Sequence, residues 1–502
     1  MRESGVLLSI TSLPSRYGIG CFSKEAYQFV DFLKKAGQTY WQILPLGQTG
    51  YGDSPYQSFS TFAGNPYFID LEKLIKAGYL KKSECDRADL GSDATKVDYE
   101  KQFINRYELL YLAYERSDIE KDRKFAKFRA ENAYWIEDYA LYMAIKKYHD
   151  NVSWEFWEED LRLRKPEILD EYREKLEKEV NFYIFLQYLF FEQWYALKNY
   201  ANKKGIRIIG DIPIYVAFDS ADSWSHPELF QFDENRMPIK VAGCPPDGFS
   251  ADGQLWGNPL YRWDYHKKTG YEWWIKRIAA CYQLYDVIRI DHFRGFDEYY
   301  AIPYGSKNAV NGEWEKGPGM DLFEAIKKNI SEDAQIIAED LGFMTDTVRK
   351  LVKDSGFPNM KVLQFGFDSR EDSDYMPHTF DKNCVVYTGT HDNDTVLGWY
   401  EKLEKNDKKL AKDYLRLTGV KKKDIPWEFI RLAMMSVANT CIIPMQDYLA
   451  LGDTARMNIP STLGGNWQWR MKKNAISDDL AKRMMTLTKL SARFPKKKRL
   501  EK

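Results

Sequence analysis

The sequence lacks an excess of charge of either sign. Its 502 residues include 73 Lys and Arg against 74 Asp and Glu, which leaves a formal net charge of -1. Proteins that attract nucleic acid or an anionic membrane generally present a positive field to it. The composition therefore argues against both kinds of partner and favours neutral ones.

Cysteine is scarce and scattered, with 6 residues in the whole chain. They form no CxxC pair and no spacing typical of metal ligands, so we expect reduced thiols, no metal and no cofactor. The cysteines are Cys21, Cys85, Cys244, Cys281, Cys384 and Cys441.

Long hydrophobic runs are also missing, since none approaches the roughly 20 residues that a membrane-spanning helix needs. The first residues lead into a short apolar stretch without a cleavage-like end. We therefore expect a cytoplasmic protein that is neither secreted nor inserted in a membrane.

Aromatic residues, in contrast, are plentiful at 15%, with 15 Trp and 34 Tyr. Flat apolar faces with polar edges suit sugar rings as well as protein cores, and we expect most of these residues to be core. The overall balance of 44% hydrophobic and 29% charged residues is typical of a globular protein.

Short apolar runs recur with helical stretches between them, which indicates repeated βα units around a parallel sheet. Eight such runs are present, the number in a closed (β/α)₈ TIM barrel. The expected strands are residues 5–10, 40–44, 206–212, 287–290, 336–338, 361–365, 384–388 and 441–445.

The length fits two domains or one elaborated barrel. We expect a single α/β barrel domain of residues 1–502, with a mostly helical insertion at about 70–195 and loops over the barrel mouth at about 219–265. Charged stretches of the insertion, such as residues 171–178, are expected to be solvated helix surface rather than a nucleic-acid contact.

Acidic residues stand at the ends of four expected strands: Asp211, Asp291, Glu339 and Asp392. The carboxyl ends of the strands form the active-site rim of such a barrel. A single Asp after a strand is often only a helix N-cap. Four acids at converging strand ends favour a catalytic rim.

Two carboxyl groups that flank a sugar linkage can split it, one as nucleophile and one as proton donor. Arg289 lies two positions before Asp291 and is expected on the same side of the strand, where its cation can hold Asp291 ionised, although a purely structural ion pair is the alternative. Glu339 is expected in a less polar pocket that keeps it protonated. Its neighbour Asp340 faces the opposite way and is expected to have a capping or structural role.

A third group of residues follows the strand at 384–388. His391 and Asp392 could bind ring hydroxyls that tighten as the sugar distorts. The alternative, a metal site built from His292, His391 and the acids, is not favoured because the spacing of paired ligands is missing.

Taken together, these segments resemble the catalytic segments of the 4-α-glucanotransferase family (amylomaltase or disproportionating enzyme), and the resemblance runs nearly from end to end. The matching segments are residues 9–14, 51–60, 245–250, 253–259, 289–296, 337–342, 389–393, 456–458 and 465–470. One departure is Ser461, which follows Pro460 where the family pattern commonly has Gly.

The resemblance implies an α-amylase-type barrel without a C-terminal β-sandwich, acting on α-1,4-glucans, maltooligosaccharides and glucose. It makes Asp291 the nucleophile, Glu339 the acid/base and Asp392 the transition-state stabiliser. The implied substrate contacts are Tyr56 under the donor glucose, Asp211, Arg289 and His391 at its hydroxyls, Trp256 and Asn258 at the acceptor groove, and Tyr51 at a second glucan contact.

Two other functions stay open at this point. A retaining α-glucan hydrolase could use the same three acids, and a glycan-binding protein without activity could use the aromatic residues alone. Transfer requires that a closed, aromatic-lined groove exclude water, and the loop at 245–259 with Trp256 is expected to help provide it.

Overall fold

The computed structural model describes residues 2–50, 52–246, 250–342 and 344–495. Within them, eight parallel strands form one sheet. These strands are β1 (Glu3–Leu7), β2 (Tyr40–Gln42), β3 (Arg207–Pro213), β6 (Val287–Asp291), β9 (Ile336–Ala338), β10 (Asn359–Val362), β11 (Cys384–Tyr387) and β12 (Thr440–Pro444).

The sheet closes into a barrel. Its order is β10-β11-β12-β1-β2-β3-β6-β9, so neighbours in the sheet follow one another along the chain and β1 pairs with β12. The two outer strands also meet, because the Ala338 N–H donates to the Pro358 carbonyl at 3.0 Å, one residue before β10. The strands are almost wholly buried, as parallel strands covered by helices must be.

The (β/α)₈ barrel and its eight strands are confirmed, and only the strand limits differ. The sixth strand was expected at 361–365, but it begins at Asn359 and ends at Val362 because residues 363–366 turn into a 3₁₀ helix. An apolar run does not distinguish a strand from a buried turn that continues it.

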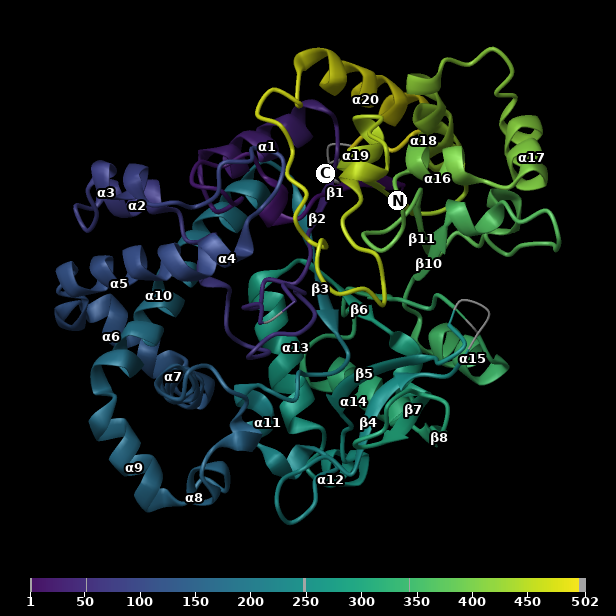
Figure 1. The fold of residues 1–502 in the computed structure, drawn as a ribbon. Helices are drawn as coiled ribbons and strands as arrows, with labels where there is room; N and C mark the ends of the chain where they lie inside the picture. Colours follow the sequence, from purple (N-terminus) through teal and green to yellow (C-terminus); the bar gives the residue numbers. More distant parts are fainter. Residues whose placement is uncertain (1, 51, 247–249, 343, 496–502) are drawn as a thin grey trace, which may run out of the picture.

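Helices cover the outside of the barrel (Figure 1). They include α1 (Lys24–Lys35), α13 (Glu272–Leu284), α14 (Met320–Asn329), α15 (Asp346–Ser355), α16 (Val396–Lys402), α17 (Lys405–Leu415), α18 (Ile425–Met435), α19 (Met445–Tyr448) and α20 (Asp478–Leu490).

Helix α15 illustrates how the local sequence sets these limits. The Thr345 side chain accepts from the Val348 N–H and caps the first turn, and Gly356 ends the helix at a φ of 74° that favours glycine. Val348, Leu351 and Val352 are buried, and their spacing places them on one face toward the barrel.

A helical lobe lies between β2 and β3, at the left of Figure 1. It contains α2 (Leu71–Lys76), α3 (Lys82–Arg87), α4 (Tyr99–Lys101), α5 (Tyr107–Arg116), α6 (Arg123–Glu131), α7 (Ala133–Tyr148), α8 (Glu159–Arg162), α9 (Pro166–Lys175) and α10 (Glu177–Lys203).

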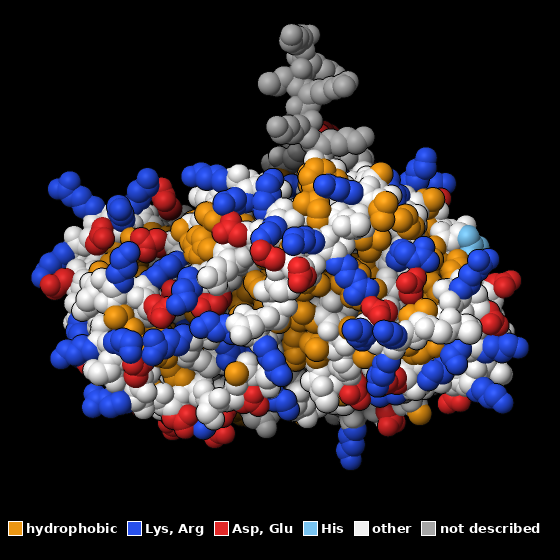
Figure 2. Space-filling view, turned by 90° about the horizontal axis from the view of Figure 1, so that it is seen from above, with side chains coloured by type: hydrophobic (Ala, Val, Ile, Leu, Met, Phe, Trp, Pro, Cys, Tyr) orange, Lys and Arg blue, Asp and Glu red, His pale blue; other side chains and the backbone are white. Residues whose placement is uncertain are grey.

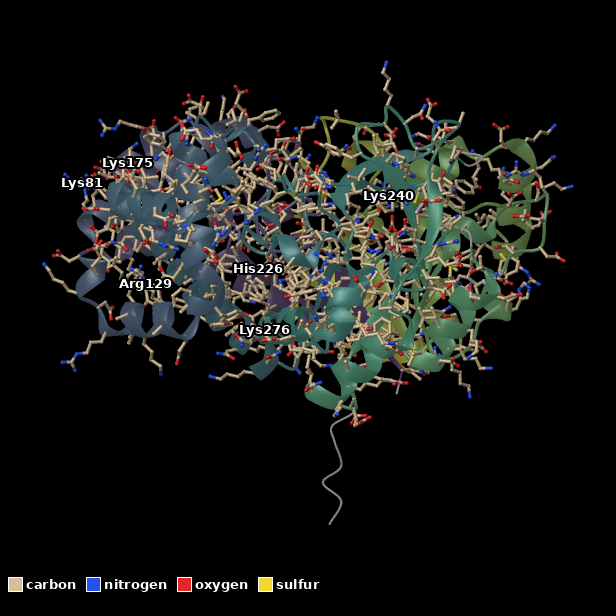
Figure 3. All side chains as sticks on the ribbon, turned by 90° about the horizontal axis from the view of Figure 1, so that it is seen from below. Lys81, Arg129, Lys175, His226, Lys240 and Lys276 are labelled. Atoms are coloured by element: carbon tan, nitrogen blue, oxygen red, sulfur yellow. The ribbon has the colours of Figure 1, made fainter. Side chains whose placement is uncertain are left out.

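The outer surface of this lobe is charged and solvated. In residues 171–178 every charged side chain is exposed, whereas Tyr172 and Leu176 are buried. Figure 3 shows Lys81, Arg129 and Lys175 on the lobe, far from Lys240 on the other side of the molecule. In Figure 2 basic and acidic side chains are interspersed over one face.

No helix of the described residues is long and apolar enough to cross a bilayer.

The segment at about 219–265, expected to form loops over the barrel mouth, contains regular secondary structure. It contains α11 (Ala221–Ser225), α12 (Trp263–Lys268), β4 (Lys240–Cys244) and β5 (Gln254–Pro259). With β7 (Glu298–Pro303) and β8 (Glu313–Lys316), the two strands form an antiparallel sheet in the order β5-β4-β7-β8. Gly243, Gly257 and Pro259 interrupt the alternation, and β4 gains a partner, β7, from much later in the chain, which local sequence does not reveal.

Candidate active site

The four acids predicted at strand ends all lie at the same end of the barrel. Asp211 is within the last residues of β3 and Asp291 ends β6, while Glu339 follows β9 directly. Asp392 lies in the loop between β11 and α16. Because parallel strands share one carboxyl edge, side chains that are far apart in the sequence converge on one rim.

Arg289 joins two of these acids. Its Nη1 atom donates to both oxygens of Asp211 at 2.7 and 2.8 Å, and its Nη2 lies 2.9 Å from Asp291 Oδ1. Asp211 and Arg289 are buried, and the Asp291 side chain is 31% exposed at the surface of the cleft. The expected shared side of Arg289 and Asp291 is therefore confirmed, and one cation balances two carboxylates.

Glu339 occupies a pocket with little water, where only 8% of the residue is exposed. Burial, followed by the negative charge of Asp291, raises its pKa to about 8. The Arg289 cation and two backbone donors oppose this shift: the His292 N–H at 2.6 Å and the Leu341 N–H at 2.8 Å. At neutral pH Glu339 thus carries a proton close to a charged Asp291.

Asp340 points away from this pocket and supports the barrel wall. Its Oδ1 accepts from the Met360 N–H at 3.0 Å and its Oδ2 from the Asn359 side chain at 3.1 Å, so it links the end of β9 to β10. The structural role expected for Asp340 is confirmed.

Tyr56 and His391 connect Asp211 to Asp392. The Tyr56 hydroxyl donates to Asp211 Oδ2 at 2.9 Å and lies 2.9 Å from His391 Nε2, and the two rings stack. Because the hydroxyl proton is directed at Asp211, the His391 Nε2–H must donate to the hydroxyl. His391 Nε2 also lies 3.3 Å from Asp392 Oδ2.

Two residues without a role in the sequence analysis hold Asp392. The Asn458 amide donates to Asp392 Oδ1 at 2.7 Å, and Arg456 donates to the Asp392 carbonyl at 2.7 Å. Both belong to the segment 456–458, which carries part of the family resemblance. That resemblance is the sequence signal that points to these two residues. Sequence alone did not show that this segment folds back onto the rim.

A cleft of about 1240 Å³, including space open to solvent, is lined by Asp291, His391 and Asp392. Trp256 and His292 line one wall, their rings edge to face at 4.8 Å, and Tyr56, His391 and Trp467 lie together on another. Burial lowers the pKa of His292 to about 4, so its ring is neutral at neutral pH.

Asn258 lies deeper in the cleft wall than an open acceptor contact would. Its Nδ2 donates to the Val216 carbonyl at 2.7 Å, and its Oδ1 accepts from Gln57 at 3.3 Å. Tyr51 lies outside the described residues, as do residues 247–249 of the expected closing loop. Among the described residues, no group of three or more His, Cys, Asp or Glu has metal-site geometry.

Comparison with known proteins decides to which family this chain belongs. The sequence profile described as 4-alpha-glucanotransferase matches residues 8–476. The chain belongs to the 4-alpha-glucanotransferase family. It is 50% identical over 488 residues to the 4-alpha-glucanotransferase of Clostridium butyricum, covering 97% of this chain and 100% of that protein. It is also 50% identical over 497 residues to the enzyme of Streptococcus pneumoniae, covering 98% of both.

Solved structures of this family share the fold. The amylomaltase from Streptococcus agalactiae in complex with acarbose superposes with a TM-score of 0.95 at 42% identity, over 99% of this chain and 100% of that one. The amylomaltase from Corynebacterium glutamicum, at 18% identity, has the same fold with a TM-score of 0.78, over 97% of this chain and 75% of that one.

Proposed function

We propose that this protein is a 4-α-glucanotransferase that moves α-1,4-glucan segments from a donor maltooligosaccharide to the 4-hydroxyl of an acceptor glucose or glucan. One observation carries the proposal: Glu339, with a pKa raised to about 8 by burial and by the charge of Asp291, accepts from the His292 N–H directly after Asp291, which is itself paired with Arg289. A retaining double displacement needs this combination of a protonated acid and an ionised nucleophile.

In the first step, an Asp291 oxygen bonds to the anomeric carbon of the donor while the bond to the glycosidic oxygen breaks. Glu339 gives its proton to that oxygen, and the shortened glucan leaves. In the second step, the ionised Glu339 takes the proton of the acceptor hydroxyl, whose oxygen displaces Asp291 from the anomeric carbon. Atoms and charge are restored at the end of the cycle.

The remaining rim residues hold the donor sugar in this proposal. Asp392 and His391 accept and donate hydrogen bonds to ring hydroxyls that tighten in the transition state. Asp211 and Arg289 bind further hydroxyls and keep Asp291 in place, and Tyr56 packs against the ring. Tyr56, His391 and Asp392 line the cleft, and Tyr56 and Arg289 both hydrogen-bond to Asp211, which supports these assignments.

The acceptor side is assigned to Trp256, with Asn258 behind it and Tyr51 at a second glucan contact. Trp256 borders the cleft beside His292, a position that supports contact with an incoming sugar. An aromatic wall excludes water and positions a sugar hydroxyl for attack, which favours transfer over hydrolysis.

We further propose that residues 1–502 form one catalytic domain, with the helical lobe as an insertion, and that the protein works in the cytoplasm without a metal or cofactor. The six free cysteines, five of them buried, support a reducing location.

The test is the product distribution from pure maltotriose. Transfer gives longer maltooligosaccharides alongside glucose, whereas a hydrolase gives only shorter products and a glycan-binding protein leaves maltotriose unchanged. Either of the last two results would overturn the proposal.

Replacement of the nucleophile provides the matched variant. We expect Asp291→Asn to lower turnover by roughly 10⁴-fold or more, the scale for loss of a covalent nucleophile, while glucan binding stays measurable by calorimetry. Asp286→Asn, the same substitution just before β6 begins, serves as the control and should retain turnover. Near-normal transfer by Asp291→Asn would remove Asp291 from this role.

A further inference from the structure

The loop of residues 388–395 carries two of the proposed donor contacts, His391 and Asp392. It leaves β11 after Tyr387 and enters α16 at Val396. We call it the rim loop. Its two ends must be held at a fixed separation, because a change at either end moves both side chains relative to Asp291.

Asp447 contacts both ends of the rim loop. Its Oδ2 accepts from the Thr388 hydroxyl at 2.6 Å, and its Oδ1 accepts from the Val396 N–H at 2.8 Å. Asp447 belongs to α19, which follows β12, and is 1% exposed. A buried carboxylate from the next strand unit thus spans the base of the loop.

Other contacts hold the middle of the rim loop. Gln364 donates to the Asp394 carbonyl at 2.8 Å, and Asn393 Oδ1 accepts from the Thr390 N–H at 2.9 Å. These contacts shape the loop, whereas Asp447 sets the distance between its start and its end. Space at the start is tight, since a Cβ on Gly389 would lie 2.5 Å from Gln364 Nε2.

We propose that Asp447 is a positioning residue for the transfer reaction: its carboxylate fixes the span from Thr388 to Val396 and thereby places His391 and Asp392 against the donor sugar. The proposal rests on the proposed function. Both carboxylate oxygens of Asp447 are occupied by Thr388 and Val396, so its effect acts through the rim loop.

The chain offers a matched control at the opposite end of the barrel. Asp286 also bridges two segments, since its Oδ2 accepts from the Ile208 N–H at 2.7 Å and from Asn202 at 2.9 Å. It precedes β6, far along the strands from the rim. Loss of Asp286 removes a similar structural bridge without touching the rim loop.

The experiment compares Asp447→Ala with Asp286→Ala at equal concentrations of folded protein, with maltotriose as substrate. We expect kcat to fall about 100-fold in Asp447→Ala, the cost of displacing reacting groups by about 1 Å, with KM changed less than threefold. Asp286→Ala should keep kcat within about threefold of the original, since its bridge is remote from the reacting groups.

The conservative variant Asp447→Asn tests the geometry. Its amide can still accept from the Val396 N–H and donate to the Thr388 hydroxyl, so kcat should recover to within about tenfold of the original. If Asp447→Ala does not fold, Thr388→Val and Thr388→Ser replace it, and only the Val variant should lose kcat.

An equal loss of kcat in Asp447→Ala and Asp286→Ala would overturn the proposal. A second readout is independent of activity: the ring resonances of His391, assigned among the 6 histidines with His391→Gln, should shift in Asp447→Ala and stay in place in Asp286→Ala. Absence of transfer in the unmodified protein would refute the proposed function, whereas unmoved His391 resonances would refute the positioning role of Asp447.

Discussion

Glu339 shows how one residue's environment ties stability to pH. Its pKa rises from an ordinary value of 4.5 to about 8 in the folded protein, so the folded state binds the proton more tightly than the unfolded state does. The stabilising contribution of the protonated form is therefore complete below pH 4.5 and is lost as the pH rises through about 8.

We therefore expect Glu339→Gln to gain stability relative to the original protein as the pH rises from 5 to 9. The relative gain should reach about 4 kcal/mol, measured by chemical unfolding at each pH. Activity of the original protein should fall on the alkaline side at a pH near 8, where the acid loses its proton.

Glu315→Gln is the control for this experiment. At Glu315 the effect of burial is outweighed by hydrogen bonds from Lys240 and Tyr299, and the pKa is lowered. Its stability difference should stay flat between pH 6 and 9. A flat profile for Glu339→Gln as well would contradict the raised pKa.

Ser461, the departure from the family pattern, adopts a left-handed conformation with φ of 62°. That conformation is unfavourable for a residue with a Cβ and explains a preference for Gly at this position. Ser461 also lines the cleft.

Ser461→Gly should raise the free energy of unfolding by about 0.5 kcal/mol, because relief of backbone strain exceeds the entropy that Gly adds to the unfolded chain. The melting temperature provides the measurement. Ser117→Gly, at a φ of -85°, should instead lower it. A drop for both variants would show that strain at Ser461 is negligible.

At the scale of elements, the antiparallel sheet brings Trp256 to the cleft. Strand β5 carries Trp256, and β4 joins β5 to β7. The segment appeared irregular in the sequence because its strands are short and their partner is distant. The barrel strands, in contrast, are continuous apolar runs, and this is why all eight could be located from the sequence.

Trp256→Ala should raise the ratio of hydrolysis to transfer by about threefold to tenfold, the effect of roughly 1 kcal/mol on the competition between water and a sugar acceptor. Glucose release and oligosaccharide growth from maltotriose give the ratio. Trp314→Ala, on β8 of the same sheet, is the control and should leave it unchanged. An unchanged ratio in Trp256→Ala would remove Trp256 from the closure of the groove.

The candidate site was predictable where chemistry follows a strand directly. Asp291 and Glu339 could be identified in this way. The two-residue period of a strand then places Arg289 on the same side as Asp291. Asn458 and Asp447 could not be assigned a partner, because their contacts with Asp392 and Thr388 depend on how strands from different parts of the chain are placed around the barrel.

At the scale of the whole molecule, Arg493, which follows α20, links the end of the described chain to β1. Its guanidinium is fully buried and donates to the carbonyls of Glu3, Met434, Ala438 and Asn439 at 2.8 to 3.1 Å. These contacts surround the start of β1 and of β12, the pair that completes the ring.

Arg493→Met should lower the melting temperature by about 3 to 6 °C, because several buried carbonyls lose a charged donor, and should leave kcat unchanged. Arg483→Met is the control: its ion pair with Asp424 is half exposed and should matter little. An equal change in both variants would show that the buried contacts add nothing beyond a surface pair.

The two backbone amides that meet Glu339 have a consequence for the interval between the two displacements. Once the side chain has given up its proton, each oxygen already faces an N–H group, at His292 and Leu341. Both oxygens of the Glu339 carboxylate then accept backbone hydrogen bonds while one sugar leaves and another binds. In the proposed mechanism, the glycosyl-enzyme can therefore wait for its acceptor without any rearrangement of Glu339.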